Sequence, residues 1–135
     1  MANTKDIAWL IDEVFRRISS GGREPVADLF TEDAVYEGIY ADDAVTGREA
    51  ISIMLAKVIP AAISPFRQWP IATYPVAGRS DLVLTEYRSD GVGVHDGRIY
   101  RNKYVGVIRL QDGKIRYWRE YYDPGLFAGD RKSVV

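Results

Sequence analysis

The sequence predicts an α+β domain in which three N-terminal helices pack on the concave face of a curved antiparallel meander sheet. Apolar residues recur at helical spacing before Pro60, whereas the later segments alternate at every second residue, as strands do. Asp112-Gly113 lies between two aromatic-rich segments, residues 98–110 and 114–124, and an Asp-Gly pair is a strong hairpin signal. Helices followed by a meander form two layers, and a curved sheet beneath helices forms a cone with an internal pocket.

Three helices are expected in the first part of the chain. Residues 4–19 form one amphipathic helix, which Ser20-Gly21-Gly22 ends. Its apolar stripe consists of Ile7, Leu10, Ile11, Val14 and Ile18. Pro25 suits the first turn of a short second helix, which would bury Val26, Leu29 and Phe30. Thr46 and Glu49 match a capping box for the third helix, and Pro60 is expected to kink or stop it.

The remaining segments read as strands. A short strand is predicted at residues 34–37, followed by a polar loop through Asp42-Asp43. Residues 66–76 are extended, but three prolines at 65, 70 and 75 each remove a hydrogen-bond donor, so an irregular edge strand is expected. Residues 82–90 form a better strand, and a loop at residues 91–97 leads into the final hairpin.

The length of 135 residues fits one domain, which would bury about 68% of its unfolded surface. We assign residues 1–128 to this single domain and residues 129–135 to a loosely ordered C-terminal tail.

The composition excludes several classes of function. A net charge of −1 gives no attraction to nucleic acid or to a membrane surface, and no apolar run of about 18 residues is present. The chain has no Cys and one His, which argues against a metal site and fits a reducing cytoplasm, where we expect the protein to reside. No Gly-rich phosphate loop precedes a helix, so no cofactor is expected.

The last predicted strand has two distinct faces. One bears Trp118, Glu120 and Tyr122, and the other bears Ile115, Tyr117, Arg119 and Tyr121. A carboxylate between two aromatic residues has unusual chemistry if its face is buried. On a solvent-facing side it is an ordinary surface group. Alternation alone does not choose between the two.

Three segments carry a resemblance to a known superfamily. They are LFTEDAVY at residues 29–36, GREAI at 47–51, and DGKI with WREY at 112–115 and 118–121. These segments resemble the cone-shaped α+β superfamily of nuclear transport factor 2, ketosteroid isomerase, scytalone dehydratase and the SnoaL-like polyketide cyclases. The resemblance covers nearly the whole chain with the same order of elements. It implies that the face with Trp118, Glu120 and Tyr122 points into the cone.

Two branches are most similar, and the first is the limonene epoxide hydrolases. Their first-strand Tyr falls on Tyr36, their last-strand catalytic Asp on Glu120, and their Asn on Gly38. Their Arg-x-Asp pair falls on Tyr87 and Ser89 without a gap, or on Arg88 and Asp90 with one residue inserted.

The second branch is the phenazine biosynthesis proteins. Their Tyr-x-Asn pattern is matched by Tyr100 and Asn102, and their last-strand Glu also falls on Glu120. Ketosteroid isomerase matches less well, because its base falls on Gly38, its Tyr near Val14 and its protonated Asp near Gly106. Steroid isomerisation by that constellation is therefore not expected.

The candidate catalytic residues are Glu120, Tyr36 and Asn102. Burial would raise the pKa of Glu120 above about 4.3 and suit it to proton exchange; the alternative is an ion pair with Arg101 or Arg88. Tyr36 donates a hydrogen bond to a substrate or is a wall aromatic, and Asn102 holds Glu120 or orients a ligand carbonyl.

The candidate ligand-binding residues are Tyr87, Tyr104, Trp118, Tyr122 and Arg88. Packing is the favoured role of Tyr104 and Trp118, and Arg88 with Asp90 is alternatively a surface pair. We expect the aromatic members, together with Tyr36, to line an apolar cavity of roughly 300–1,000 Å³.

Three functions remain open. The first is an enzyme that binds a small hydrophobic, oxygen-bearing metabolite and acts on it by acid–base chemistry of the isomerase, hydrolase, dehydratase or cyclase type, centred on Glu120. The second is a non-catalytic ligand-binding or accessory protein, and the third is a dimerisation module with a filled cone. A homodimer through the outer sheet face is also expected, because Ile115, Tyr117 and Tyr121 would otherwise expose much aromatic surface.

Overall fold

The computed structural model describes residues 4–38 and 44–123. The predicted loop at Asp42-Asp43 and the predicted tail at residues 129–135 lie outside this part of the chain. The elements follow the order α1 (Thr4–Ile18), the 3₁₀ turn η1 (Ala27–Leu29), β1 (Phe30–Gly38), β2 (Val45–Thr46), α2 (Arg48–Ile53), the π-helical turn η2 (Met54–Val58), α3 (Ile59–Ala62), β3 (Ile63–Val76), β4 (Arg79–Gly93), β5 (Ile99–Gln111) and β6 (Lys114–Tyr122).

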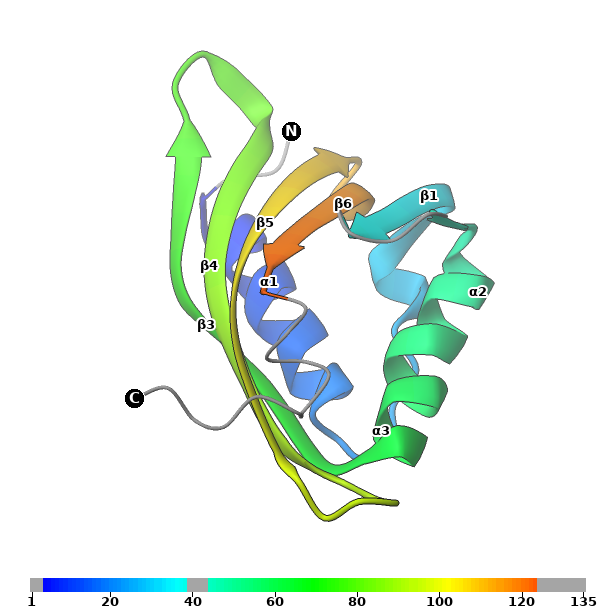
Figure 1. The fold of residues 1–135 in the computed structure, drawn as a ribbon. Helices are drawn as coiled ribbons and strands as arrows, with labels where there is room; N and C mark the ends of the chain where they lie inside the picture. Colours follow the sequence, from blue (N-terminus) through cyan, green and yellow to red (C-terminus); the bar gives the residue numbers. More distant parts are fainter. Residues whose placement is uncertain (1–3, 39–43, 124–135) are drawn as a thin grey trace.

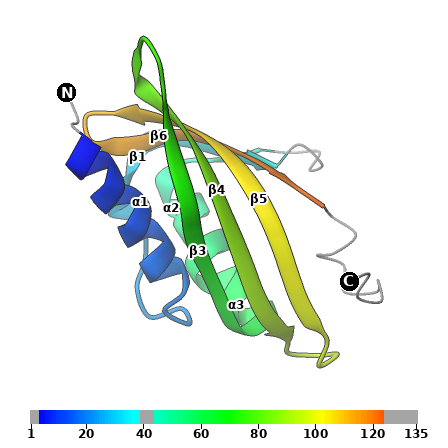
Figure 2. The same ribbon diagram turned by 90° about the vertical axis from the view of Figure 1, so that its left-hand side faces the viewer.

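The six strands form one sheet in the order β2-β1-β6-β5-β4-β3, with β3 at an edge as predicted. Strands β3 to β6 are an antiparallel meander, but β1 runs parallel to β6, so the sheet is mixed and the prediction of a purely antiparallel sheet is wrong. No hairpin connects β1 to β6, and the intervening chain is long enough to return in either direction. Figures 1 and 2 show a strongly curved sheet with α1 inside its curve and α2 and α3 on the same side.

The prediction of three N-terminal helices is also wrong. The predicted second helix is a three-residue 3₁₀ turn, and the chain is already extended at Phe30, with φ −114° and ψ 152°. Entering the strand at Phe30 lets this ring bury itself beside Trp118, with ring centroids 6.3 Å apart. Packing of that aromatic pair stabilises the extended conformation at this position.

The predicted third helix is found, but its start differs from expectation. Thr46 lies in β2 opposite Val35, and Gly47, with φ +93°, caps α2 without a side-chain hydrogen bond. The expected capping box is therefore absent. Pro60 does not stop the helix, which continues to Ala62 after a π-helical turn: the proline has no N–H for the Ala56 carbonyl, and the Ile59 N–H bonds to Met54, five residues back.

The final hairpin confirms the Asp-Gly prediction. Asp112 and Gly113 have φ values of 53° and 75°, as a tight turn of this type requires. Tyr117 pairs with Arg109 and Ile115 with Leu110, so Arg116 is an extra residue in a β-bulge. This bulge reverses the alternation: Ile115 is fully buried on the concave face, and its predicted exposure on the outer face is wrong.

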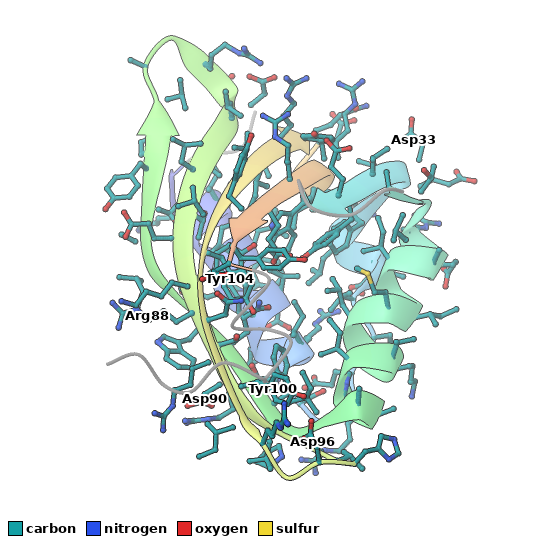
Figure 3. All side chains as sticks on the ribbon, viewed as in Figure 1. Asp33, Arg88, Asp90, Asp96, Tyr100 and Tyr104 are labelled. Carbon is teal, nitrogen blue, oxygen red and sulfur yellow. The ribbon has the colours of Figure 1, made fainter. Side chains whose placement is uncertain are left out.

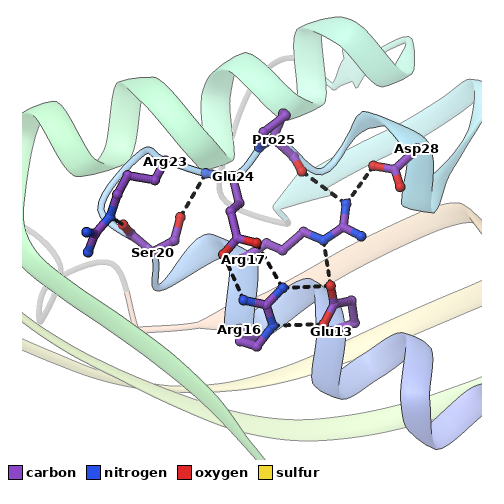
Figure 4. A network of polar contacts seen from close by, with 8 residues as sticks. All are labelled: Glu13, Arg16, Arg17, Ser20, Arg23, Glu24, Pro25 and Asp28. Carbon is purple, nitrogen blue, oxygen red and sulfur yellow. Dashed lines mark hydrogen bonds and ion pairs between the residues drawn. The ribbon is translucent and has the colours of Figure 1, made fainter.

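A network of charged side chains fastens the end of α1 to the segment that leads into η1 (Figure 4). Arg16 bonds to Glu13 at 2.8 Å and to Glu24 at 2.7 Å, and Arg17 joins Glu13 to Asp28 at 2.7 and 2.6 Å. The hydrogen bonds from Arg16 and then Arg17 lower the pKa of Glu13 to about 2. The network positions α1, whose inner side covers the candidate site.

We expect Glu13→Gln to flatten the acid dependence of stability. Because the pKa of Glu13 is depressed on folding, its contribution is present above about 4.5, the unfolded value, and is lost as the pH falls toward about 2. Urea unfolding at about pH 5 and about pH 3 should show a smaller loss in the variant than in the wild type. Glu32→Gln, at an exposed position of β1, is the control and should follow the wild type.

Candidate functional site

Strand β6 places Glu120 on the concave face, as the resemblance implied. Trp118 is fully buried, Glu120 is 8% exposed and Tyr122 is half-buried. Glu120 lies opposite Gly106 of β5 and beside Gly38 of β1. Two neighbours without side chains leave room around the carboxylate for aromatic rings from other positions.

A chain of buried hydrogen bonds ends at this carboxylate. The Trp118 indole Nε1–H donates to the Tyr87 hydroxyl oxygen at 3.0 Å, and the Tyr87 hydroxyl donates to Glu120 Oε1 at 2.5 Å. Tyr36 also hydrogen-bonds to Glu120. The three donors come from β6, β4 and β1, so the curvature of the sheet is what brings them together.

Burial raises the pKa of Glu120 above its ordinary value, and the hydrogen bonds from Tyr87 and Tyr36 only partly oppose this effect. Arg88 and Arg101 are exposed on the opposite face of the sheet, so the alternative of an ion pair with Glu120 is not realised. Burial also raises the pKa of Tyr36 and Tyr87 well above the usual range, and Glu120 adds to both effects. Both tyrosines are therefore neutral hydrogen-bond donors at physiological pH.

Two of the proposed ligand-binding residues are enclosed by the core. Tyr87 is 1% exposed, and its ring packs on Tyr104 at 4.7 Å and on Phe15 of α1 at 4.8 Å. Trp118 packs edge-on to Phe15 at 5.6 Å. The polar atoms of Tyr87 and Trp118 are thus used for the hydrogen bonds that lead to Glu120.

Tyr104, Tyr122 and Asn102 also lie on the concave side of the sheet, and Tyr104 and Asn102 hydrogen-bond to groups other than Glu120. The Tyr104 hydroxyl is 2.7 Å from Ser89 Oγ, and the Tyr104 and Tyr122 rings are 5.7 Å apart. Asn102 Nδ2 donates to the Asp123 carbonyl at 3.1 Å, and Asn102 Oδ1 accepts from the Lys103 N–H. The amide of Asn102 therefore secures the end of β6 rather than holding Glu120, and its catalytic role stays a prediction.

The structure corrects the assignment of Arg88. Its side chain is exposed and points away from the helices (Figure 3), because the ungapped register directs Tyr87 and Ser89 inward. Asp90 shares the outer face and forms an ion pair with Arg67 at 2.9 Å. Arg88 therefore does not contact the concave site.

Sequence reasoning missed the role of Tyr87 as the main donor to Glu120, and it missed Ser89 and Gln68. Both are buried, and both hydrogen-bond to Tyr104. The signal was available, since Tyr87 and Ser89 occupy the ungapped positions of the Arg-x-Asp pair. The predicted cavity volume stays a prediction.

The part of the chain that the structure describes has neither a metal-binding cluster nor a membrane-spanning helix. No group of three or more His, Asp or Glu side chains in residues 4–38 and 44–123 is arranged to hold a metal ion. Within the same ranges, no helix has the length and apolar character needed to cross a membrane.

Comparison with known proteins identifies the family. The model of the SnoaL-like domain matches residues 11–118, which is most of the chain. The chain belongs to the SnoaL-like domain family. This confirms the resemblance drawn from residues 29–36, 47–51 and 112–121.

Individual proteins and solved structures are similar to this chain over most of its length. The uncharacterized protein YesE of Bacillus subtilis is 31% identical over 72% of this chain and 67% of its own length. An uncharacterized PhzA/B-like protein of Pseudomonas aeruginosa is 28% identical over 81% of this chain and 78% of its own length. A limonene epoxide hydrolase-like protein of Mycobacterium tuberculosis has the same fold, with a TM-score of 0.73 and 19% identity over 93% of this chain and 92% of that one.

Gly106 is essential to the close approach of these rings. A Cβ at this position would lie 2.9 Å from Trp118 Nε1 and 3.0 Å from Tyr87 Cε1, both in the closed core. We expect Gly106→Ala to lower the free energy of unfolding by about 1–3 kcal/mol through overpacking. Gln111→Ala, at an exposed position at the end of the same strand, should change it by less than about 0.5 kcal/mol. Equal urea midpoints for both variants would contradict this account.

Proposed function

We propose that this protein is an enzyme that transfers protons to and from a small, uncharged, oxygen-bearing hydrophobic molecule, with Glu120 as the acid–base residue. The observation that carries the proposal is a carboxyl group held in an aromatic environment by two neutral tyrosine donors, with no cation paired to it among the described residues. Its raised pKa brings proton exchange closer to neutral pH.

The exposure of the side chains indicates where a substrate reaches Glu120. Trp118 and Tyr87 are sealed in the core, whereas Tyr36 and Glu120 keep 7% and 8% of their surface. The reacting edge therefore contains Glu120 and Tyr36. Glu120 would deliver or remove the proton, and Tyr36 would orient the carboxyl group by donating its hydroxyl hydrogen to the carboxylate form.

The surroundings also define the class of substrate. Rings of Tyr36, Tyr104 and Tyr122 favour an apolar molecule, and an anionic molecule would meet the Glu120 carboxylate without a compensating cation. A hydrolase-like protein is among the structural neighbours, and a proton-transfer site of this kind agrees with hydrolysis, isomerisation, dehydration or cyclisation.

The test compares wild type, Glu120→Gln and Glu86→Gln, the last being an exposed carboxylate of β4. Each protein is incubated with an organic extract of bacterial metabolites, and the compounds consumed and formed are followed by mass spectrometry. We expect at least one neutral compound to be converted by the wild type and by Glu86→Gln but not by Glu120→Gln. Retention of a compound by all three proteins without conversion would instead identify a binding protein, and conversion by all three would remove Glu120 from the mechanism.

We still expect a homodimer that forms through the outer face of the sheet. Ile115 is not part of this face, because it is buried. Val105 and Tyr121 are cross-strand partners there, and both are exposed together with Trp69. Light scattering at micromolar concentration should give twice the mass of one chain. Val105→Glu, which places a charge in the centre of this face, should halve that mass; a wild-type monomer would contradict the prediction.

A further inference from the structure

Two tyrosines contact Glu120, but their hydroxyl groups are held differently. The oxygen of Tyr87 lies between Trp118 Nε1 and Glu120 Oε1, and these are its hydrogen-bond partners among the described residues. An indole N–H is only a donor, so Tyr87 must accept from Trp118. The single hydrogen of the Tyr87 hydroxyl is then directed at Oε1, which is the acceptor bonded to it among the described residues, and the Tyr87 ring itself is packed among the rings of Phe15, Tyr104 and Trp118.

The opposite arrangement leaves a buried donor without a partner. If the carboxyl proton were on Oε1 and were donated to Tyr87, the Tyr87 oxygen would accept two hydrogen bonds and its own hydrogen would point into an aromatic core. An unsatisfied buried donor is costly, and burial of Tyr87 to 1% exposure excludes relief from solvent. Oε1 therefore remains an acceptor whether Glu120 is charged or neutral.

We propose that Tyr87, fixed by Trp118, is a positioning residue that keeps Oε1 of Glu120 an acceptor and so places the exchangeable proton of Glu120 on Oε2. The proposal rests on the proposed function, because it specifies which oxygen performs the proton transfer. The indole N–H of Trp118 donates to Tyr87 and not to Tyr36, so Tyr36 is the partner that can reverse: its hydroxyl donates to the carboxylate and accepts from the carboxylic acid.

The transfer that follows moves one proton and nothing else. The Oε2–H bond breaks, an O–H bond forms on the substrate oxygen, and the negative charge left on Glu120 is stabilised by the hydroxyls of Tyr87 and Tyr36. Return of a proton from the substrate or from water to Oε2 restores the acid. Gly106 is needed for the bond between Trp118 and Tyr87, since a side chain at this position would push the two residues apart.

The test reads the ionisation of Glu120 directly, without substrate. Protein labelled with ¹³C at the Glu carboxyl carbons is titrated by NMR, and Glu120→Gln identifies the resonance. We expect Tyr87→Phe to raise the Glu120 midpoint by about one pH unit, which is what one ordinary hydrogen bond is worth. Tyr104→Phe is the matched control, because its ring stacks on Tyr87 but its hydroxyl binds Ser89; its midpoint should equal that of the wild type.

A second variant separates positioning from general damage to the core. Trp118→Phe removes the indole donor, keeps an aromatic ring and should raise the midpoint in the same direction; it carries the test if Tyr87→Phe does not fold. A midpoint unchanged in Tyr87→Phe, or equal shifts in Tyr87→Phe and Tyr104→Phe, would overturn the proposal. The titration needs no substrate. If the midpoints shift as expected but the protein converts no compound, the proposed function fails and the role of Tyr87 stands.

Discussion

Glu120→Gln is expected to lower turnover by about 10²- to 10⁴-fold, the usual contribution of a positioned acid–base group. The same substitution should raise the stability of the fold at neutral pH. Both effects have one cause, which is that the protein holds a carboxyl group where its charged form is disfavoured. Gln is nearly isosteric, and its side-chain oxygen still accepts the Tyr87 hydrogen bond.

The sign of the stability effect follows from linkage. The pKa of Glu120 is higher in the folded protein than in the unfolded chain, so stability is fully present below the unfolded value and is lost as the pH rises through the folded value. Gln does not titrate and has no such loss. The advantage of the variant should therefore grow with increasing pH and vanish in acid.

Urea unfolding of the wild type and of Glu120→Gln, measured from acid to neutral pH, checks the prediction. Turnover of the identified substrate is measured alongside. Glu86→Gln, on the exposed outer face, should change neither the activity nor the pH dependence. A Glu120→Gln protein that is inactive and also less stable at neutral pH would show that the carboxylate is a structural group and that its charge is compensated.

Local patterns in the sequence predicted the elements whose residues carry their own signals. The apolar stripe of α1, the Asp112-Gly113 turn and the proline-interrupted edge strand β3 all follow from propensity and turn chemistry. The inward face of Glu120 came from the resemblance, and the structure confirms it.

The errors arise where tertiary contacts determine the outcome. Nothing local in residues 30–38 specifies a parallel partner, and β1 meets β6 only after the rest of the chain has folded back. The bulge at Arg116 contains no Gly, so the sequence does not indicate it. It nevertheless moves Ile115 from the outer face to the concave face. The bond from Tyr87 to Glu120 joins β4 to β6 across β5, a contact that neither strand reveals by itself.

Trp118→Ala is expected to cause the largest loss of stability, about 3–5 kcal/mol. The Trp118 ring is fully buried and contacts aromatic rings from three other elements. The ring-centroid distances are 5.1 Å to Tyr36, 5.6 Å to Phe15 and 5.8 Å to Tyr87. Truncation leaves a cavity that the rigid curve of the sheet cannot close, and it removes the donor to Tyr87.

The chain offers a matched control in Trp9, which is exposed on α1. Trp9→Ala removes the same number of atoms from a surface position and should change the free energy of unfolding by less than about 0.5 kcal/mol. Urea unfolding followed by circular dichroism compares the two without relying on tryptophan fluorescence. Similar midpoints for both variants would mean that the core collapses around position 118 without cost. In that case the aromatic packing could not hold Tyr87 against Glu120, because the same contacts that stabilise the fold fix the geometry of the site.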